Sequence, residues 1–137
     1  MGLHTAYFDA SVKPTPRGTL GIGGVIFDHD RLVLEIADYD TNLWTVNEGE
    51  YAALCVVVSA LRSLGARCVT IYGDSQLVVR QVRGEYMVRN PILEQIRQLI
   101  YDDLRRIPEW SIHHVPREQN KLADALSRRE RPENRRS

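Results

Sequence analysis

Four acidic residues that lie far apart in the sequence have the types and the settings needed to bind a cation together. Asp74 ends a β-branched run that passes directly into an apolar helical pattern, so it should stand at the carboxyl end of a strand, where open α/β sheets bind ligands. Asp9 falls among apolar residues of another strand, where a buried carboxylate is costly unless a cation or several donors compensate it. Glu50 and Asp124 lie in segments that one fold can bring to Asp74. We therefore expect a metal ion shared by these acids.

Each of these positions also has an ordinary structural explanation. An Asp or Ser between a strand and a helix is a common N-cap, so Asp74 can simply cap the helix that follows. Asn47 and Glu50 have the spacing of a capping box, which explains both residues without catalysis. Asp9 can face water if its strand lies at an edge of the sheet. Judged singly, Asp74 and the pair of Asn47 and Glu50 are explained better by capping. Only the combination of acids favours a functional site.

The elements that would position the acids follow the order β-β-β-α-β-α-α-β-α. Apolar alternation indicates the strands, and apolar residues at helical period indicate the helices. The strands are expected over residues 4–11, 20–27, 31–37, 68–72 and 109–115, and the helices over residues 47–64, 75–83, 92–107 and in a last segment after Asn120. The first three strands form an antiparallel meander, and the first, fourth and fifth are parallel neighbours. We expect an α/β fold with a five-stranded mixed sheet flanked by helices.

The composition is that of one ordinary globular domain. The chain has 137 residues, and a domain of this size buries about two-thirds of the surface that its unfolded chain exposes. Its 18 basic and 18 acidic residues balance, so the net charge gives no indication of a polyanionic partner. We expect a domain over residues 1–127 and a polar Arg-rich tail over residues 128–137. Such a tail is usually a solvated end, but arginine binds phosphate well and can add weak affinity for nucleic acid.

The sequence indicates a soluble, cytoplasmic protein. Cys55 and Cys68 lack the partner spacing of a metal site and are interpreted as small core residues in a reducing compartment. The first residues lack the charged-then-apolar pattern of a leader, and the longest apolar run, residues 52–58, is too short to cross a bilayer. No heptad or apolar surface stripe indicates association, so we expect a monomer with no membrane contact and no obligate protein partner.

Four segments together resemble the signature blocks of type 1 ribonuclease H, in its short form without the basic protrusion. The segments are Tyr7-Phe8-Asp9-Ala10-Ser11, residues 47–54, residues 73–78 and residues 115–126. The match spans nearly the whole chain and implies the ribonuclease H-like fold. It also implies an endoribonuclease that hydrolyses the RNA strand of RNA–DNA hybrids and leaves 5′-phosphate and 3′-hydroxyl ends.

The resemblance implies a two-metal centre. Asp9, Glu50, Asp74 and Asp124 would bind two Mg²⁺ ions, for which Mn²⁺ can substitute, because hard divalent cations prefer carboxylate oxygens. Such ions activate the attacking water and stabilise the departing oxygen.

The resemblance also implies residues that touch the hybrid. Asn47 and Gln76 would contact the minor groove, where 2′-hydroxyl groups distinguish RNA from DNA. The further candidates for substrate contacts are Ser11, Ser75 and Asn120.

A positively charged auxiliary group is expected near the scissile phosphate. Related enzymes place a mobile His close to the last acid, and His114 lies ten residues before Asp124. Arg117 can supply the positive group instead, because His113 and His114 fall in a strand pattern where a His can simply be packed.

Some positions depart from the family pattern. Ala10 replaces the usual Gly after the first Asp, Thr15 stands where an Asn that contacts substrate is common, and Val46 replaces one Asn of a usual pair. Residues 83–91 are too few to form the basic handle of some relatives. We therefore expect weaker affinity for the hybrid, partly offset by the Arg-rich tail.

Three other functions remain open. A DNA nuclease of the same superfamily would keep the fold and the acids, but Asn47 and Gln76 argue against it. A noncatalytic hybrid-binding module excised from a reverse transcriptase would have no need of four like charges. An unrelated α/β protein with ordinary helix caps explains Asn47 and Asp74 but not Asp9 within a strand.

Overall fold

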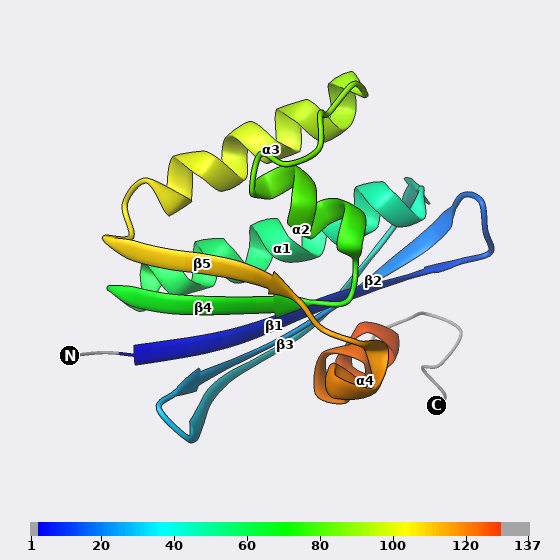
Figure 1. The fold of residues 1–137 in the computed structure, drawn as a ribbon. Helices are drawn as coiled ribbons and strands as arrows, with labels where there is room; N and C mark the ends of the chain where they lie inside the picture. The colour runs from blue at the N-terminus through cyan, green and yellow to red at the C-terminus, as the bar shows by residue number, and fades with distance from the viewer. Residues whose placement is uncertain (1–2, 130–137) are drawn as a thin grey trace.

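The computed structural model describes residues 3–129, which form a sheet with helices on both of its faces (Figure 1). In chain order the elements are β1 (Leu3–Lys13), β2 (Gly18–Asp28), β3 (Arg31–Trp44), α1 (Val46–Ser63), β4 (Cys68–Gly73), α2 (Gln76–Val82), α3 (Pro91–Leu104), β5 (Glu109–His114), the 3₁₀ helix η1 (Arg117–Gln119) and α4 (Lys121–Arg129). The five strands lie in the order β3-β2-β1-β4-β5. Strand β2 is antiparallel to both of its neighbours, whereas β4 is parallel to β1 and β5. The expected mixed sheet is therefore confirmed.

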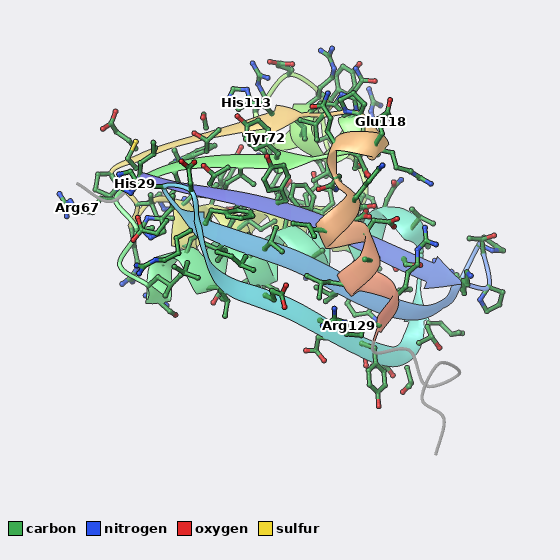
Figure 2. The ribbon with its side chains drawn as sticks, turned by 90° about the horizontal axis from the view of Figure 1, so that it is seen from below. His29, Arg67, Tyr72, His113, Glu118 and Arg129 are labelled. Carbon is green, nitrogen blue, oxygen red and sulfur yellow. The ribbon has the colours of Figure 1, made fainter. Side chains whose placement is uncertain are left out.

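Two neighbouring glycines of β2 show how the helices divide between the faces of the sheet. Successive residues of a strand point to opposite faces. A Cβ atom at Gly24 would lie 2.6 Å from the side chain of Val57 in α1, whereas one at Gly23 would lie 1.9 Å from the backbone oxygen of Ala123 in α4. Helix α1 therefore covers one face, with α3 packed against it, and α4 crosses β1, β2 and β3 on the other face, as Figure 2 shows from the α4 side.

The main core lies between the sheet and α1. Ala6 and Phe8 of β1 and Ile71 of β4 point into it and are fully buried. Tyr51 of α1 is fully buried as well, and its hydroxyl donates a hydrogen bond of 2.7 Å to Oε1 of Gln81 in α2. Burial of an apolar side chain as large as Phe8 or Ile71 stabilises the fold by about 1.5–3 kcal/mol. This packing fixes β1, β4 and α1 relative to one another.

The two largest differences from the expected boundaries lie at the ends of β3 and α3. Strand β3 continues to Trp44 rather than ending at Ala37, because Trp44 pairs with Gly18 and so extends the β2–β3 ladder. Helix α3 ends at Leu104 rather than at Ile107, and Pro108 explains an early end because a proline disfavours helical backbone in the residue before it.

The last described helix overlaps the segment expected to be a tail. Arg128 and Arg129 are the last two residues of α4, whereas residues 130–137 lie outside the described residues. Within the described range, no helix is long and apolar enough to span a membrane.

Candidate metal centre

The structure brings three of the four expected acids into one group. One carboxylate oxygen from each of Asp9, Glu50 and Asp74 lies within 4.8 Å of the other two. The side chains are largely withdrawn from water, since Asp9 is 5% exposed and Glu50 is 6% exposed. Carboxylate oxygens at this spacing can coordinate a hard divalent cation.

The register of two strands explains why Asp9 and Asp74 meet. Strands β1 and β4 are parallel, Tyr7 lies beside Tyr72, and the two rings stack with their centroids 5.2 Å apart. Two residues further along, Asp9 lies on the same face of the sheet as the rings, and Asp74 follows directly after the end of β4. A slip of one residue would turn one of the acids into the core. The stacked rings therefore help to hold the two acids side by side.

At the start of α1, the capping box leaves Glu50 free. Thr45 Oγ1 accepts a hydrogen bond of 3.1 Å from the Glu48 N–H, and Glu48 Oε1 accepts one of 3.0 Å from the Thr45 N–H. The capping box of Asn47 and Glu50, one interpretation of the sequence, is therefore wrong. Because β3 runs on to Trp44, the chain enters the helix two residues earlier than that spacing supposes.

At the start of α2, the N-cap is Ser75 and not Asp74. Ser75 Oγ accepts a hydrogen bond of 3.4 Å from the Val78 N–H. The sequence equally allows Asp74 as the N-cap, but its carboxylate lies in the group with Asp9 and Glu50. Ser75, expected among the substrate contacts, uses its side chain within the protein.

Burial and mutual repulsion raise the pKa values of two of the acids, Asp9 and Glu50. The pKa of Asp9 is raised from 3.8 to about 7, chiefly by burial and then by the charge of Asp74. Burial also raises the pKa of Glu50 well above its ordinary value, and the charges of Asp9 and Asp74 raise it further, whereas Arg117 lowers it. The Oε1 atom of Glu50 is buried and has no hydrogen-bond partner within residues 3–129. A divalent cation would satisfy this oxygen and remove the repulsion, so the residues fit a metal site.

Asp124 reaches the group from the opposite side of the sheet to α1. Its charge contributes to the raised pKa of Asp9, although its oxygens lie outside the close group of three. The approach depends on Gly23, which pairs with Asp9 in the sheet. A Cβ atom at Gly23 would lie 1.9 Å from the Ala123 oxygen and 2.5 Å from the Ser127 nitrogen, so only glycine lets α4 lie this close to the strand.

Asn120 connects the segments that carry the acids. Its side chain is 1% exposed, and Nδ2 donates hydrogen bonds to the Phe8 carbonyl oxygen (2.9 Å) and to Oδ2 of Asp74 (3.4 Å). Its own carbonyl oxygen accepts a hydrogen bond of 3.0 Å from the Asp124 N–H in α4. Asn120 was expected among the substrate contacts, but the structure places its amide inside the protein, where it holds Asp74 against β1.

The two candidates for the auxiliary group lie in different settings. Arg117, in η1, is close enough to the acids for its charge to lower the pKa of Glu50. His114 is exposed at the end of β5 and pairs with Gly73, the residue before Asp74. The structure thus places the charge of Arg117 near Glu50, and it places the backbone of His114 beside the residue that precedes Asp74.

The remaining expected contact residues lie at the surface around the acids. Asn47 is exposed in the first turn of α1, and Gln76 is exposed at the start of α2. Ser11 is half-buried on β1, two residues after Asp9 and on the same face of the sheet.

One relevant residue was missed: Arg128, whose Nη2 lies 3.1 Å from both oxygens of Asp124. Their spacing of one helical turn was the signal available in the sequence.

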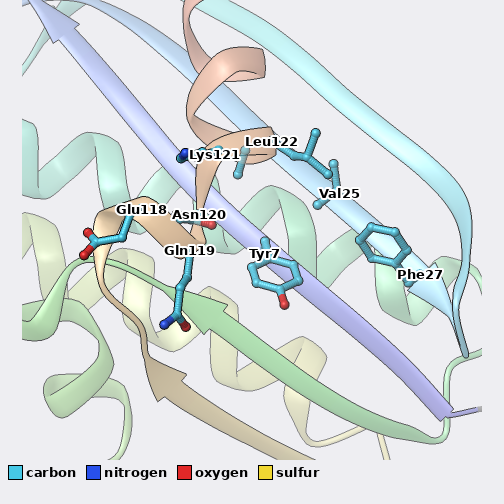
Figure 3. Close-up of a pocket in the computed structure, with 9 residues that line it drawn as sticks. Tyr7, Val25, Phe27, Glu118, Gln119, Asn120, Lys121 and Leu122 are labelled. Atoms are coloured by element: carbon cyan, nitrogen blue, oxygen red, sulfur yellow. The ribbon is translucent and has the colours of Figure 1, made fainter.

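A cavity of about 240 Å³ lies between the sheet and the start of α4 (Figure 3). Tyr7, Val25 and Phe27 form its sheet side, and residues 118–123 form the other. None of the three grouped acids lines this cavity, so the chemistry that they support lies outside it.

Comparison with known proteins identifies relatives over nearly the whole chain. A family model described as "Reverse transcriptase-like" matches residues 7–130. Ribonuclease HI of Halobacterium salinarum is 34% identical over 122 residues, which make up 89% of this chain and 61% of that protein. The chain therefore spans about three-fifths of the length of this relative.

Solved structures give the same result. RNase H1 of Halobacterium salinarum is 35% identical and superimposes with a TM-score of 0.86, covering 91% of this chain and 94% of that one. LC11-RNase H1, isolated from compost and solved in complex with an RNA/DNA hybrid, is 32% identical with a TM-score of 0.83, covering 90% and 92% of the two chains.

Proposed function

Since the chain belongs to the reverse transcriptase-like family and has the ribonuclease H fold, we propose that it is an endoribonuclease that hydrolyses the RNA strand of RNA–DNA hybrids. The observation that carries this proposal is the group formed by Asp9, Glu50 and Asp74, whose oxygens lie within 4.8 Å of one another in a buried setting. Relatives at 32–35% identity are ribonucleases H1, and one of them was solved with a hybrid bound. The fold and the acids together support hydrolysis over mere binding.

The carboxylates would hold the cations that this chemistry requires. Asp9, Glu50 and Asp74 would be the central ligands, and Asp124 would join them from α4; two Mg²⁺ ions are proposed, with Mn²⁺ as an effective substitute. When bound, such ions supply an activated water and stabilise the oxygen that departs, which leaves 5′-phosphate and 3′-hydroxyl ends.

The other residues of the chain would position these groups and the hybrid. Asn120 keeps Asp74 oriented through its amide, and so acts as a positioning residue rather than as a substrate contact. Arg117 carries a positive charge that lowers the pKa of Glu50, and it would stabilise the scissile phosphate. Asn47 and Gln76, both exposed at helix starts, would contact the minor groove of the hybrid.

The decisive experiment compares end-labelled RNA–DNA hybrid, double-stranded RNA and double-stranded DNA of one sequence, each with Mg²⁺, Mn²⁺ or chelator. We expect metal-dependent cleavage of the RNA strand of the hybrid alone. Cleavage of DNA would instead support a DNA nuclease of the same superfamily, and binding without cleavage would support a noncatalytic hybrid-binding module.

A matched pair of variants tests the site. Asp74→Asn should abolish cleavage and leave the circular dichroism spectrum native, because the amide keeps the shape of the side chain but loses the charge. Asp30→Asn, which removes an exposed acid from the β2–β3 turn, should leave cleavage unchanged. Retained activity in the Asp74 variant would refute the site assignment.

A further inference from the structure

Asp124 differs from the other three acids in having a basic partner. The Nη2 atom of Arg128 lies 3.1 Å from Oδ1 and 3.1 Å from Oδ2, one turn further along α4. Both oxygens that Asp124 would offer to a cation are therefore engaged by one guanidinium nitrogen. Within residues 3–129, no ion pair of this kind is formed by Asp9, Glu50 or Asp74.

The setting of the pair allows it to open. The side chain of Arg128 is 53% exposed and that of Asp124 is 27% exposed. Exposed ion pairs are weak because water competes for both partners and because salt screens them. A guanidinium in this position can be displaced by a divalent cation, but the displacement lowers the apparent affinity for that cation.

We propose that Arg128 competes with the cation for Asp124, so that the carboxylate becomes a full metal ligand only when the guanidinium turns away from it. This inference rests on the proposed function and concerns the regulation of the same centre. Arg128 is thus a positioning residue that sets how much free cation is needed to load the centre. The competition should also respond to ionic strength, since salt weakens the pair of Arg128 with Asp124.

Neighbouring arginines on α4 provide a matched comparison. Arg129 is exposed like Arg128 and carries the same charge one residue further along the helix, at the position labelled in Figure 2. Arg128→Gln and Arg129→Gln both remove one positive charge and keep a good helix former. Only the first removes the recorded partner of Asp124.

The test measures Mn²⁺ binding to the full chain without nucleic acid, with free Mn²⁺ followed by electron paramagnetic resonance at low salt. Arg128→Gln should bind Mn²⁺ about two- to fivefold more tightly than the unmodified protein, as expected from the strength of exposed ion pairs. Arg129→Gln should change the affinity little. Salt at about 0.5 M screens charges that lie more than a few ångströms apart. The gain in Mn²⁺ affinity of Arg128→Gln should therefore shrink at this salt concentration.

A second pair of variants separates competition at Asp124 from a general effect of charge. In an Asp124→Asn background, Arg128→Gln should no longer tighten binding, because the shared carboxylate is gone. Unchanged or weaker binding by Arg128→Gln, an equal gain in Arg129→Gln, or a gain that persists with Asp124→Asn would each overturn the inference. If the unmodified protein cleaves hybrid but Arg128→Gln gives no gain, only the competition is wrong, whereas absence of both Mn²⁺ binding and cleavage would overturn the proposed function as well.

Discussion

Replacing Asp9 by Asn should stabilise the cation-free protein, and the gain should depend on pH. The folded-state pKa of Asp9 is about 7, against an ordinary value of 3.8. Well below pH 4 the carboxyl holds its proton in both the folded and the unfolded chain, so its ionisation does not affect stability. Between pH 4 and 7 the unfolded chain loses this proton while the folded chain keeps it, and the free energy of unfolding falls by about 1.4 kcal/mol per pH unit.

The full loss is reached above pH 7 and amounts to about 4 kcal/mol. Asn cannot ionise and can still accept the hydrogen bond that the Ala10 N–H donates to Asp9 Oδ1. Asp9→Asn therefore escapes the loss, and it also relieves Glu50, whose pKa the charge of Asp9 raises. The difference in stability between the variant and the unmodified protein should grow by about 4 kcal/mol from pH 4 to pH 8.

Urea denaturation in chelator, followed by the fluorescence of Trp44 and Trp110, measures this difference across the pH range. Asp30→Asn is the control, because that acid is exposed in the β2–β3 turn, outside the group of acids. The growth with pH carries the reasoning, since the change in packing caused by the substitution is independent of pH. A difference that stays constant within about 1 kcal/mol would refute the account of burial and repulsion at Asp9.

Three further outcomes follow from the structure. Thr45→Ala should cost about 1 kcal/mol of unfolding free energy in urea, because it removes the cap of α1, whereas Asn47→Ala should change it by less than about 0.5 kcal/mol. Gly23→Ala should destabilise the protein by about 1–3 kcal/mol and weaken Mn²⁺ binding, because its Cβ would push α4 off the sheet; unchanged binding would contradict this view of α4. Arg117→Ala should lower turnover of hybrid by about tenfold or more and His114→Ala by less, since the charge of Arg117 reaches Glu50; the reverse order would make His114 the auxiliary group.

The order of the elements and the meeting of the acids were accessible from the sequence because both depend on local patterns. Apolar alternation and helical period locate the strands and helices, and the parallel pairing of β1 and β4 follows from the helix between them. Asp9 within a strand was the informative acid, because a buried charge demands compensation wherever the strand lies.

The cap of α1 shows why boundaries were harder to predict. Thr45 with Glu48 and Asn47 with Glu50 both fit the capping-box pattern, and the two candidates overlap by two residues. The choice between them depends on where β3 stops pairing with β2, which is a property of the whole sheet. Local sequence cannot make that choice.

Gly23 and Asn120 show the same limit at the site. A strand glycine indicates a bulge or a close approach, but only the packed structure shows that α4 is the element that approaches Gly23. Asn120 stands in a segment rich in polar residues, and its burial becomes visible only when η1 folds over β1.

Because α4 packs on Gly23, Asp124 is held near the other acids by the position of this helix, whereas Asp9, Glu50 and Asp74 belong to elements around the main core. The described part of α4 has nine residues, and a helix of that length is marginal without its tertiary contacts. It can detach as a local opening while β1, α1 and β4 stay folded around the main core. Each opening would carry Asp124 away from the other acids, so the exchange of α4 amide hydrogens with solvent would report how often the centre is incomplete. A bound cation that uses Asp124 would slow this exchange, because the ion would hold α4 against the sheet.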